Sequence, residues 1–188
     1  MDADIEKIIA ACRTIFSEKL LDYGPVWLVF RWISLTDQIF IKLCRLRSLE
    51  EADGQRQVAD TPEDEYRGII NYCLIGLMKD GGHLPSPEEV LQNPNLLDDL
   101  PPDDILCHYD AQVSRALLLL SQKNNDYDSA WRGMALPSIT DQMLMKILRV
   151  KHILSSPREL ESVDSLPSQL TDILNYSIFS LLIAEGSV

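Results

Sequence analysis

The stretch that decides the fold is SEKLLDYGPVWLVFRWISLTDQIFIKLCR, from Ser17 to Arg45, which returns 104 positions later as SQKNNDYDSAWRGMALPSITDQMLMKILR, from Ser121 to Arg149. Aligning residues 16–47 with 120–151 without a gap gives eleven identities in 32 positions, where chance gives about two. The same offset pairs Asn71-Tyr72 with Asn175-Tyr176. The chain is therefore read as a tandem duplication.

The repeat divides the chain into a first unit at residues 1–79, a linker at 80–103 and a second unit at 104–188. The linker is rich in Pro, Gly, Asp and Asn, and we expect one short helix in it at 87–92, with Ser86 as its N-cap. Because a linker of this length reaches from the end of one unit to the start of the next, we predict that the units pack about a pseudo-twofold axis, as a fused dimer would.

We predict three helices in each unit, because apolar residues recur at helical spacing and no segment shows the alternating pattern of a strand. In the second helix an S-x-x-D pattern predicts Ser34 and Ser138 as N-caps, with Asp37 and Asp141 completing a capping box. The predicted fold is all-α, with two tandem three-helix repeats. The expected helices cover 4–21, 34–50 and 62–79 in the first unit, and 104–122, 138–155 and 167–184 in the second.

The composition of the chain limits the classes of binding partner that we expect. A 46% hydrophobic content predicts a globular chain with a core, and the net charge of −12 would repel a nucleic acid backbone, so we expect no long DNA or RNA partner. The longest apolar run, residues 116–120, is too short for a bilayer, and the N-terminus lacks a signal peptide, so we expect a cytoplasmic protein without membrane contact.

The four cysteines show no metal-binding or disulfide spacing, which favours core thiols; they are Cys12, Cys44, Cys73 and Cys107.

The second helix of each unit carries a narrow polar stripe on an otherwise apolar surface. In the first unit the stripe is Gln38, Lys42 and Arg45, and in the second it is Gln142, Lys146 and Arg149. A helix that is apolar on its other faces is mostly buried, and buried Lys and Arg side chains need anionic partners. These partners can come from the protein or from a ligand.

Two interpretations follow. In a structural network, Asp22 and Asp64 neutralise Lys42 and Arg45. In a phosphate or nucleotide pocket, Lys and Arg bind phosphates, a loop Tyr or Trp contacts a base, and Asp22 together with an aspartate of the third helix holds Mg²⁺. The third helix also has a stripe of positions along one face. In the first unit these positions hold Asp64, Gly68 and Asn71, and in the second they hold Ser168, Asp172 and Asn175. The aspartate of the stripe therefore stands one helical turn later in the second unit than in the first.

Within this pocket interpretation, we assign ligand-binding roles to the side chains that the repeat duplicates. Asn71 and Asn175 could equally bond to neighbouring backbone, and the two tryptophans could equally plug a core. The candidate ligand-binding residues are Lys19, Asp22, Tyr23, Trp27, Gln38, Lys42, Arg45 and Asn71, and Lys123, Asp126, Tyr127, Trp131, Gln142, Lys146, Arg149 and Asn175. The candidate metal ligands are Asp22, Asp64, Asp126 and Asp172, with Mg²⁺ as the metal. No catalytic residue is assigned.

The motif string resembles a known family. KNNDYDSAWR at 123–132, SITDQ at 138–142 and KILR at 146–149 resemble the first type of nucleotide-modification-associated domain, a family of domains of unknown function, and EKLLDYGPVW at 18–27 with TDQIFIKLCR at 36–45 resembles it again. The two copies cover nearly the whole chain outside the linker.

The third helix also shows a distant similarity to another family. Its D-x3-D-x2-N-Y element is similar to the last motif of MazG-type all-α nucleoside triphosphate pyrophosphohydrolases, whose acidic pairs bind Mg²⁺. This chain departs from that pattern, because Gly68 replaces one acid in the first unit, Ser168 replaces the other in the second, and Gln, Lys and Arg stand where the second helix would need acids. A composite site across the pseudo-twofold and a binder without catalysis both stay open.

The function we expect is binding of a small phosphorylated nucleotide-like ligand, with Mg²⁺-dependent hydrolysis as the reaction that the acids would allow. The alternative is a non-enzymatic interaction or sensor protein whose Lys/Arg stripes are structural salt-bridge networks. Whether the protein is an enzyme and whether it forms a homo-oligomer stay open.

Overall fold

The computed structural model describes residues 2–51, 61–126, 130–155 and 165–186, and within these ranges all regular structure is helical. The first unit holds α1 (Asp2–Tyr23), the 3-10 helix η1 (Val26–Val29), α2 (Trp32–Glu51) and α3 (Pro62–Asp80). The linker holds α4 (Pro87–Gln92) and η2 (Pro94–Leu97). The second unit holds α5 (Pro102–Asp126), η3 (Ala130–Gly133), α6 (Leu136–Ser155) and α7 (Leu166–Ala184). The predicted all-α class and the linker helix at 87–92 are confirmed.

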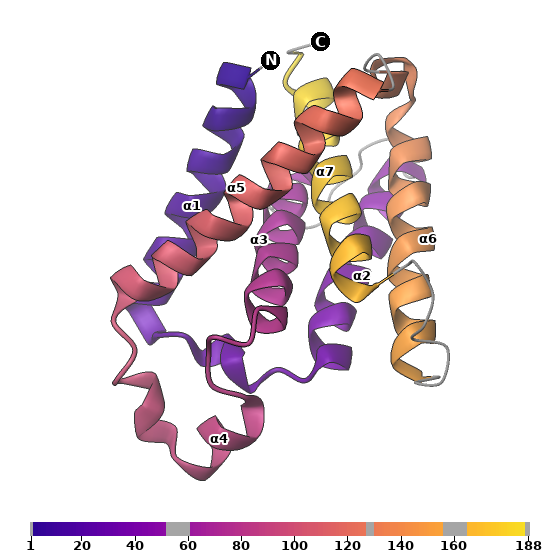
Figure 1. Ribbon diagram of the computed structural model, residues 1–188. Coiled ribbons are helices and arrows are strands. Elements are labelled where there is room, and N and C mark those ends of the chain that lie inside the picture. The colour runs from indigo at the N-terminus through magenta and orange to yellow at the C-terminus, as the bar shows by residue number, and fades with distance from the viewer. Residues whose placement is uncertain (1, 52–60, 127–129, 156–164, 187–188) are drawn as a thin grey trace.

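The helices form three layers, and each layer pairs equivalent helices of the two units (Figure 1). Helices α3 and α7 pack together in the middle, with α1 and α5 on one side and α2 and α6 on the other. Because both faces of the middle layer are covered, its helices are buried all round over long stretches. Every residue from Cys73 to Met78 in α3 is buried, and so is every residue of the equivalent stretch of α7, from Ser177 to Leu182.

Some contacts between the units are reciprocal along the offset of 104. Asp37 pairs with Lys151 at 2.6 Å, and the equivalent residues, Asp141 and Arg47, pair at 3.6 Å. Helix α1 packs on α7, and its counterpart α5 packs on α3. Reciprocal contacts are those that a twofold relation produces. The pseudo-twofold axis itself stays a prediction.

The predicted start of the second helix in each unit is wrong. Helix α2 begins at Trp32 and α6 at Leu136, so Ser34 and Ser138 lie inside helices and are not N-caps. In α6 the reason is Pro137, because proline favours the first turn of a helix. In α2 the N–H of Leu35 already bonds to the carbonyl of Arg31, so the chain is helical when it reaches Ser34. Asp37 and Asp141 therefore act in the ion pairs between units.

Capping boxes occur at two other helix starts within the described residues. Thr61 and Asp64 cap α3, and Ser86 and Glu89 cap α4, so the prediction of Ser86 as an N-cap is confirmed. In both boxes the side chain of the N-cap accepts from the backbone of the third helical residue, whose carboxylate accepts in return.

The cysteine prediction is confirmed only in part. Cys12 and Cys73 are fully buried, Cys44 is partly buried, and Cys107 is exposed. Cys107 lies opposite Ala3 in the repeat, and Ala3 is exposed as well, so this position faces outward in both units. Within the described residues, no helix has the length and hydrophobicity that crossing a membrane requires.

Candidate functional site

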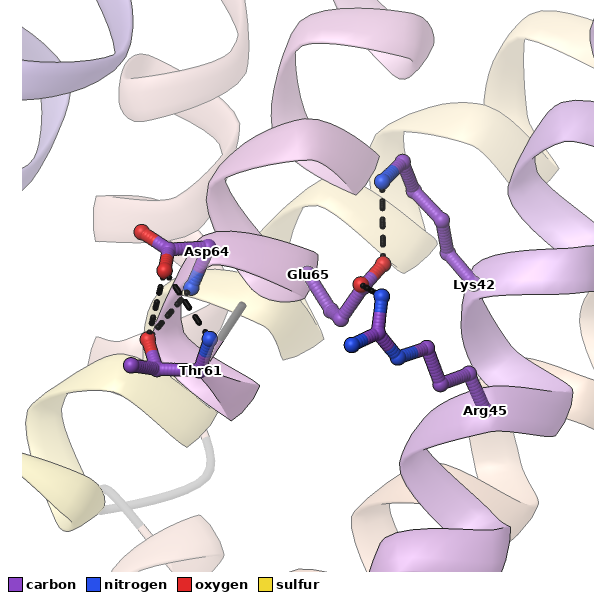
Figure 2. Close-up of polar contacts among 5 residues, drawn as sticks. All are labelled: Lys42, Arg45, Thr61, Asp64 and Glu65. Carbon is purple, nitrogen blue, oxygen red and sulfur yellow. Dashed lines mark hydrogen bonds and ion pairs between the residues drawn. The ribbon is translucent and has the colours of Figure 1, made fainter. Parts of the chain in front are cut away.

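One buried carboxylate joins the two cations of the α2 stripe. Glu65 on α3 accepts from Lys42 Nζ at 2.9 Å and from Arg45 Nη1 at 2.6 Å (Figure 2). The side chain of Glu65 is 3% exposed, whereas those of Lys42 and Arg45 are 27% and 30% exposed. The stripe therefore has an acidic partner from the protein, but this partner is Glu65 and not the predicted Asp22 or Asp64.

Asp64 faces the other way and caps its own helix. Its Oδ2 accepts from the backbone N–H of Thr61 at 3.0 Å and from the Thr61 hydroxyl at 2.8 Å (Figure 2). These hydrogen bonds, the backbone one first, lower the pKa of Asp64 because they favour the charged carboxylate. Adjacent residues on a helix point about 100° apart, so only one of Asp64 and Glu65 can face α2.

A cavity of about 570 Å³ lies in the first unit, between α1, η1, α2 and α3. Its volume falls within the range of small-molecule sites, about 300 to 1,000 Å³. One part of its wall is charged or polar and the remainder is aromatic or aliphatic. The lining residues are Ile15, Phe16, Lys19, Leu20, Tyr23, Gly24, Val26, Trp27, Phe30, Lys42, Asp64, Glu65, Gly68, Asn71, Tyr72 and Ile75.

Gly68 leaves the space that the Lys42 side chain occupies. A Cβ atom at position 68 would lie 2.8 Å from Lys42 Cε and 3.0 Å from Lys42 Nζ. Any larger residue at 68 would therefore have to displace the lysine. The glycine lets the ammonium group cross α3 at the cavity wall while it stays bonded to Glu65.

A residue of the second unit contacts two residues of the cavity wall. Asn71 donates to the carbonyl of Cys12 at 3.0 Å and accepts from the Tyr109 hydroxyl at 2.8 Å. Tyr109 comes from α5, is fully buried, and stacks on Phe16 with ring centroids 4.7 Å apart. Both ends of the Asn71 amide are thus held, and its orientation in the wall is fixed. Asn71 therefore bonds to a backbone carbonyl of α1, 59 residues away, and not to neighbouring backbone as the alternative interpretation has it.

Trp27 contributes a buried donor to the wall. Its Nε1 is buried and has no hydrogen-bond partner in the described part of the chain. The ring centroid lies 6.3 Å from that of Phe16. Nearby, burial raises the pKa of Tyr72, which keeps its phenol neutral. The Trp27 ring therefore adds aromatic surface to the cavity, while its indole N–H is buried.

The structure brings together some of the predicted first-unit residues and leaves others apart. Lys19, Tyr23, Trp27, Lys42, Asp64 and Asn71 all line the cavity. Asp22 is exposed, Gln38 is partly buried, and neither is part of the wall. Arg45 is also outside the wall and is connected to it through Glu65.

The equivalent region of the second unit is built differently. Lys146 pairs with Asp172 at 2.7 Å, and Asp172 stands where the first unit has Gly68. Trp131 is buried and stacks on Phe179 with ring centroids 4.2 Å apart. Gln142 is partly buried and Arg149 is exposed, so the predicted burial of Arg149 is wrong. Lys123, Asp126 and Tyr127 are also predicted site residues, and their side chains lie outside the described part of the chain.

Buried amides of the second unit lack the partners that the first unit provides. Neither end of the Asn175 amide has a hydrogen-bond partner within the described ranges, and the same holds for the Oε1 of Gln169. Ile5 occupies the position equivalent to Tyr109, so no hydroxyl corresponds to the one that reaches Asn71. The repeated asparagine therefore has two different environments.

The predicted metal ligands do not assemble into one centre within the described residues. No group of three or more His, Cys, Asp or Glu side chains there is placed to share a metal ion. Asp64 is engaged with Thr61, and Asp172 with Lys146. The side chain of Asp126 lies outside the described residues, and Mg²⁺ as the metal stays a prediction.

Glu65, Gly68, Phe16 and Tyr109 were not among the predicted site residues. A signal for Glu65 existed, because the repeat pairs it with Gln169 and both are polar residues on helices with long apolar runs. Gly68 carried a signal too, since it stands opposite Asp172 in the alignment. Nothing local marks Phe16 and Tyr109, which meet only because α1 packs on α5.

One family model matches the chain twice, over residues 19–79 and 123–183, and its description is nucleotide modification associated domain 1. The chain belongs to this family. Both copies of nucleotide modification associated domain 1 begin at a repeated lysine and are offset by 104 positions, as the internal alignment predicts. No curated protein and no solved structure matches the chain. The similarity to MazG-type enzymes stays a prediction.

Proposed function

We propose that the first-unit cavity binds a small phosphorylated nucleotide-like ligand. The observation that carries this proposal is the composition of the wall, in which Lys19 and Lys42 lie on the same cavity as Tyr23 and Trp27. Lysines suit a phosphate and aromatic rings suit a base. The description of the family as nucleotide modification associated agrees with a ligand of this class.

Each side chain has a distinct part in this proposal. The Lys42 ammonium carries three N–H donors, one of which goes to Glu65, and the others are available to phosphate oxygens. Lys19 is exposed at the cavity and adds a second cation. Asn71 keeps one amide N–H beyond its bond to Cys12, and this N–H is the natural donor to a sugar or base oxygen.

Mg²⁺-dependent hydrolysis is a separate step that needs metal ligands. The acids of the cavity wall, Asp64 and Glu65, already accept hydrogen bonds from Thr61 and from Lys42 and Arg45. We therefore propose binding as the function of this cavity, and we treat Mg²⁺ as a variable of the experiment.

Calorimetric titration of the chain of residues 1–188 with nucleotides, with and without Mg²⁺, tests the proposal. We expect Lys42→Met to weaken binding about tenfold or more, because it removes a charge next to the phosphate. Lys146→Met is the matched control at the equivalent position and should leave the affinity unchanged. Phosphate release is measured in the same samples. Absence of binding to any nucleotide, or equal losses in both variants, would contradict the proposal.

A second candidate function is a non-enzymatic interaction or sensor protein. The observation that favours it is Glu65, a carboxylate of the protein itself that bonds to both Lys42 and Arg45. If the stripe is only a structural network, Lys42→Met and Arg45→Ala should lower the melting temperature of the unliganded protein, and no nucleotide should raise it.

A further inference from the structure

Helices α2 and α6 form an outer layer of the molecule, which the middle layer covers from one side (Figure 1). Within the described ranges α2 packs mainly on α3 and α6, and α6 packs mainly on α2 and α7. The middle layer differs, because α1 and α5 lie on its second side. In the part of the chain that the structure describes, the outward side of α2 and α6 is therefore open to solvent.

Apolar side chains lie at equivalent positions on this outward side. Ile41 is 60% exposed, and Met145, which the repeat pairs with it, is 45% exposed. Three residues further along each helix stand Cys44, which is partly buried, and Leu148, which is 52% exposed. Residues three apart on a helix are neighbours on its surface. These four side chains, which we call the outer patch, form an apolar surface of the kind that marks interaction sites.

Ion pairs between α2 and α6 bring the two halves of the outer patch together. Asp37 pairs with Lys151 at 2.6 Å. Arg47 pairs with Asp141 at 3.6 Å, so the two helices run antiparallel. In this register the two halves of the outer patch lie level with each other, and one ion pair lies at each end. An apolar centre with a polar rim is the usual anatomy of a protein interface.

The order of the charges favours a second copy of this chain as the partner. Each end of the outer patch has one acid and one base, and the two come from different helices. If a second copy faces the patch about a twofold axis parallel to the helices, α2 lies opposite α6 of the copy, and Asp37 faces Lys151. If the axis runs across the helices, α2 lies opposite α2 of the copy, and Asp37 faces Arg47. Both orientations place acids opposite bases, so the surface is complementary to itself, as a twofold interface requires.

We propose that the chain forms a homodimer through the outer patch. In this dimer α2 and α6 of the two copies pack face to face, with the apolar side chains in the centre and the charged residues at the rim. The inference goes beyond the proposed function, because none of the four patch residues lines the first-unit cavity. Dimerisation and nucleotide binding can therefore be tested separately.

Sedimentation equilibrium of the chain of residues 1–188 tests the proposal. We expect a dimer at micromolar concentrations, and we expect Ile41→Glu to raise its dissociation constant at least about a hundredfold, because a twofold interface buries each substitution twice. Leu118→Glu is the matched control, since Leu118 lies on α5 and is 64% exposed, and it should leave the dimer unchanged. If Ile41→Glu fails to fold, as circular dichroism would show, Leu148→Glu provides the same test. A wild type that stays monomeric, which would leave the patch to an unlike partner, or equal weakening by the control, would overturn the inference.

The rim gives a second test, in which two variants change the net charge equally. Arg47→Glu leaves two acids at one end of the outer patch and should weaken dimerisation about tenfold. Arg115→Glu makes the same change at an exposed position of α5 and should have no effect. Sedimentation equilibrium of both variants measures the difference. If both variants weaken the dimer equally, general repulsion between copies accounts for the effect and the complementary rim is refuted.

Discussion

The two units share their repeated polar residues but differ in the residues that surround them. In the first unit the acid of the third helix is Glu65, with Gly68 one turn later; in the second the order is Gln169 and then Asp172. Both arrangements give the repeated lysine an acidic partner, at 2.9 Å for Lys42 and 2.7 Å for Lys146. The shift leaves room beside Lys42 and places a carboxylate at the same point in the second unit.

The aromatic residues differ in the same way. Trp131 stacks on Phe179 with an angle of 6° between the ring planes, and it is 7% exposed. The first unit has Ile75 at the position of Phe179, and its Trp27 lines the cavity. An identical residue in both units therefore plugs a core in one and lines a cavity in the other. Sequence identity within the repeat does not establish an identical site.

The repeated asparagines give the largest expected difference between the units. Asn71→Leu removes two hydrogen bonds and leaves the buried Tyr109 hydroxyl without its acceptor, which should destabilise the protein by about 2 to 4 kcal/mol. Asn175→Leu removes an amide that has no partner within the described residues, and it should be neutral or stabilising. Denaturant unfolding of both variants measures this. Equal losses would show that Asn175 is hydrogen-bonded in solution, for example to a buried water.

Much of the fold could be predicted from the sequence because helical periodicity and the repeat are local or self-comparing signals. The linker helix after Ser86 is an example, since its N-cap, proline and glutamates lie within a few residues. The starts of α2 and α6 could not be found from the S-x-x-D pattern, because Asp37 and Asp141 bond to the opposite unit. Contacts between distant residues can override a local capping pattern, and the local sequence carries no information about them.

The candidate site was predictable in its residue types but not in its pairing. Lys42 and Asn71 were found from the repeat and do line the cavity. The choice between Asp64 and Glu65 depended on the rotation of α3 about its axis, and a change of one residue turns the side chain by about 100°. Tyr109 is distant in sequence from the residues it contacts, so only the packing of α5 on the first unit reveals it.

The position of the acid gives the next largest effect. Glu65→Gln gives the first unit the residue of the second and deprives Lys42 and Arg45 of their shared carboxylate, which should cost about 2 kcal/mol because both cations are partly exposed. Adding Gly68→Asp completes the arrangement of the second unit and should recover roughly half of this loss. Thermal and denaturant unfolding compare the single and double variants. A double variant less stable than Glu65→Gln would show that the two arrangements cannot be exchanged.

The smallest expected effect concerns a contact between the units that has no counterpart along the repeat. Thr140 donates to Glu50 at 2.7 Å, whereas the equivalent Thr36 donates to the carbonyl of Trp32, because Leu154 replaces the glutamate. Burial is the main cause that raises the pKa of Glu50, and the Thr140 bond opposes it. The folded state thus binds this proton more tightly than the unfolded chain does.

A raised carboxyl pKa predicts the sign of a pH dependence. The contribution of Glu50 to the stability of the wild type should fall as the pH rises from the ordinary glutamate pKa, about 4.3, through the raised value of Glu50. Glu50→Gln keeps an oxygen that accepts from Thr140 but has no charge to bury. Its stability relative to the wild type should therefore increase over this pH range and then stay constant, with a total change below about 1 kcal/mol, since the side chain is only partly buried. Urea unfolding of both proteins at pH 4 and pH 7 measures the difference, in which the other titrating groups cancel. A difference that stays constant, or that shrinks as the pH rises, would mean that hydrogen bonding and Arg47 outweigh burial at this carboxylate.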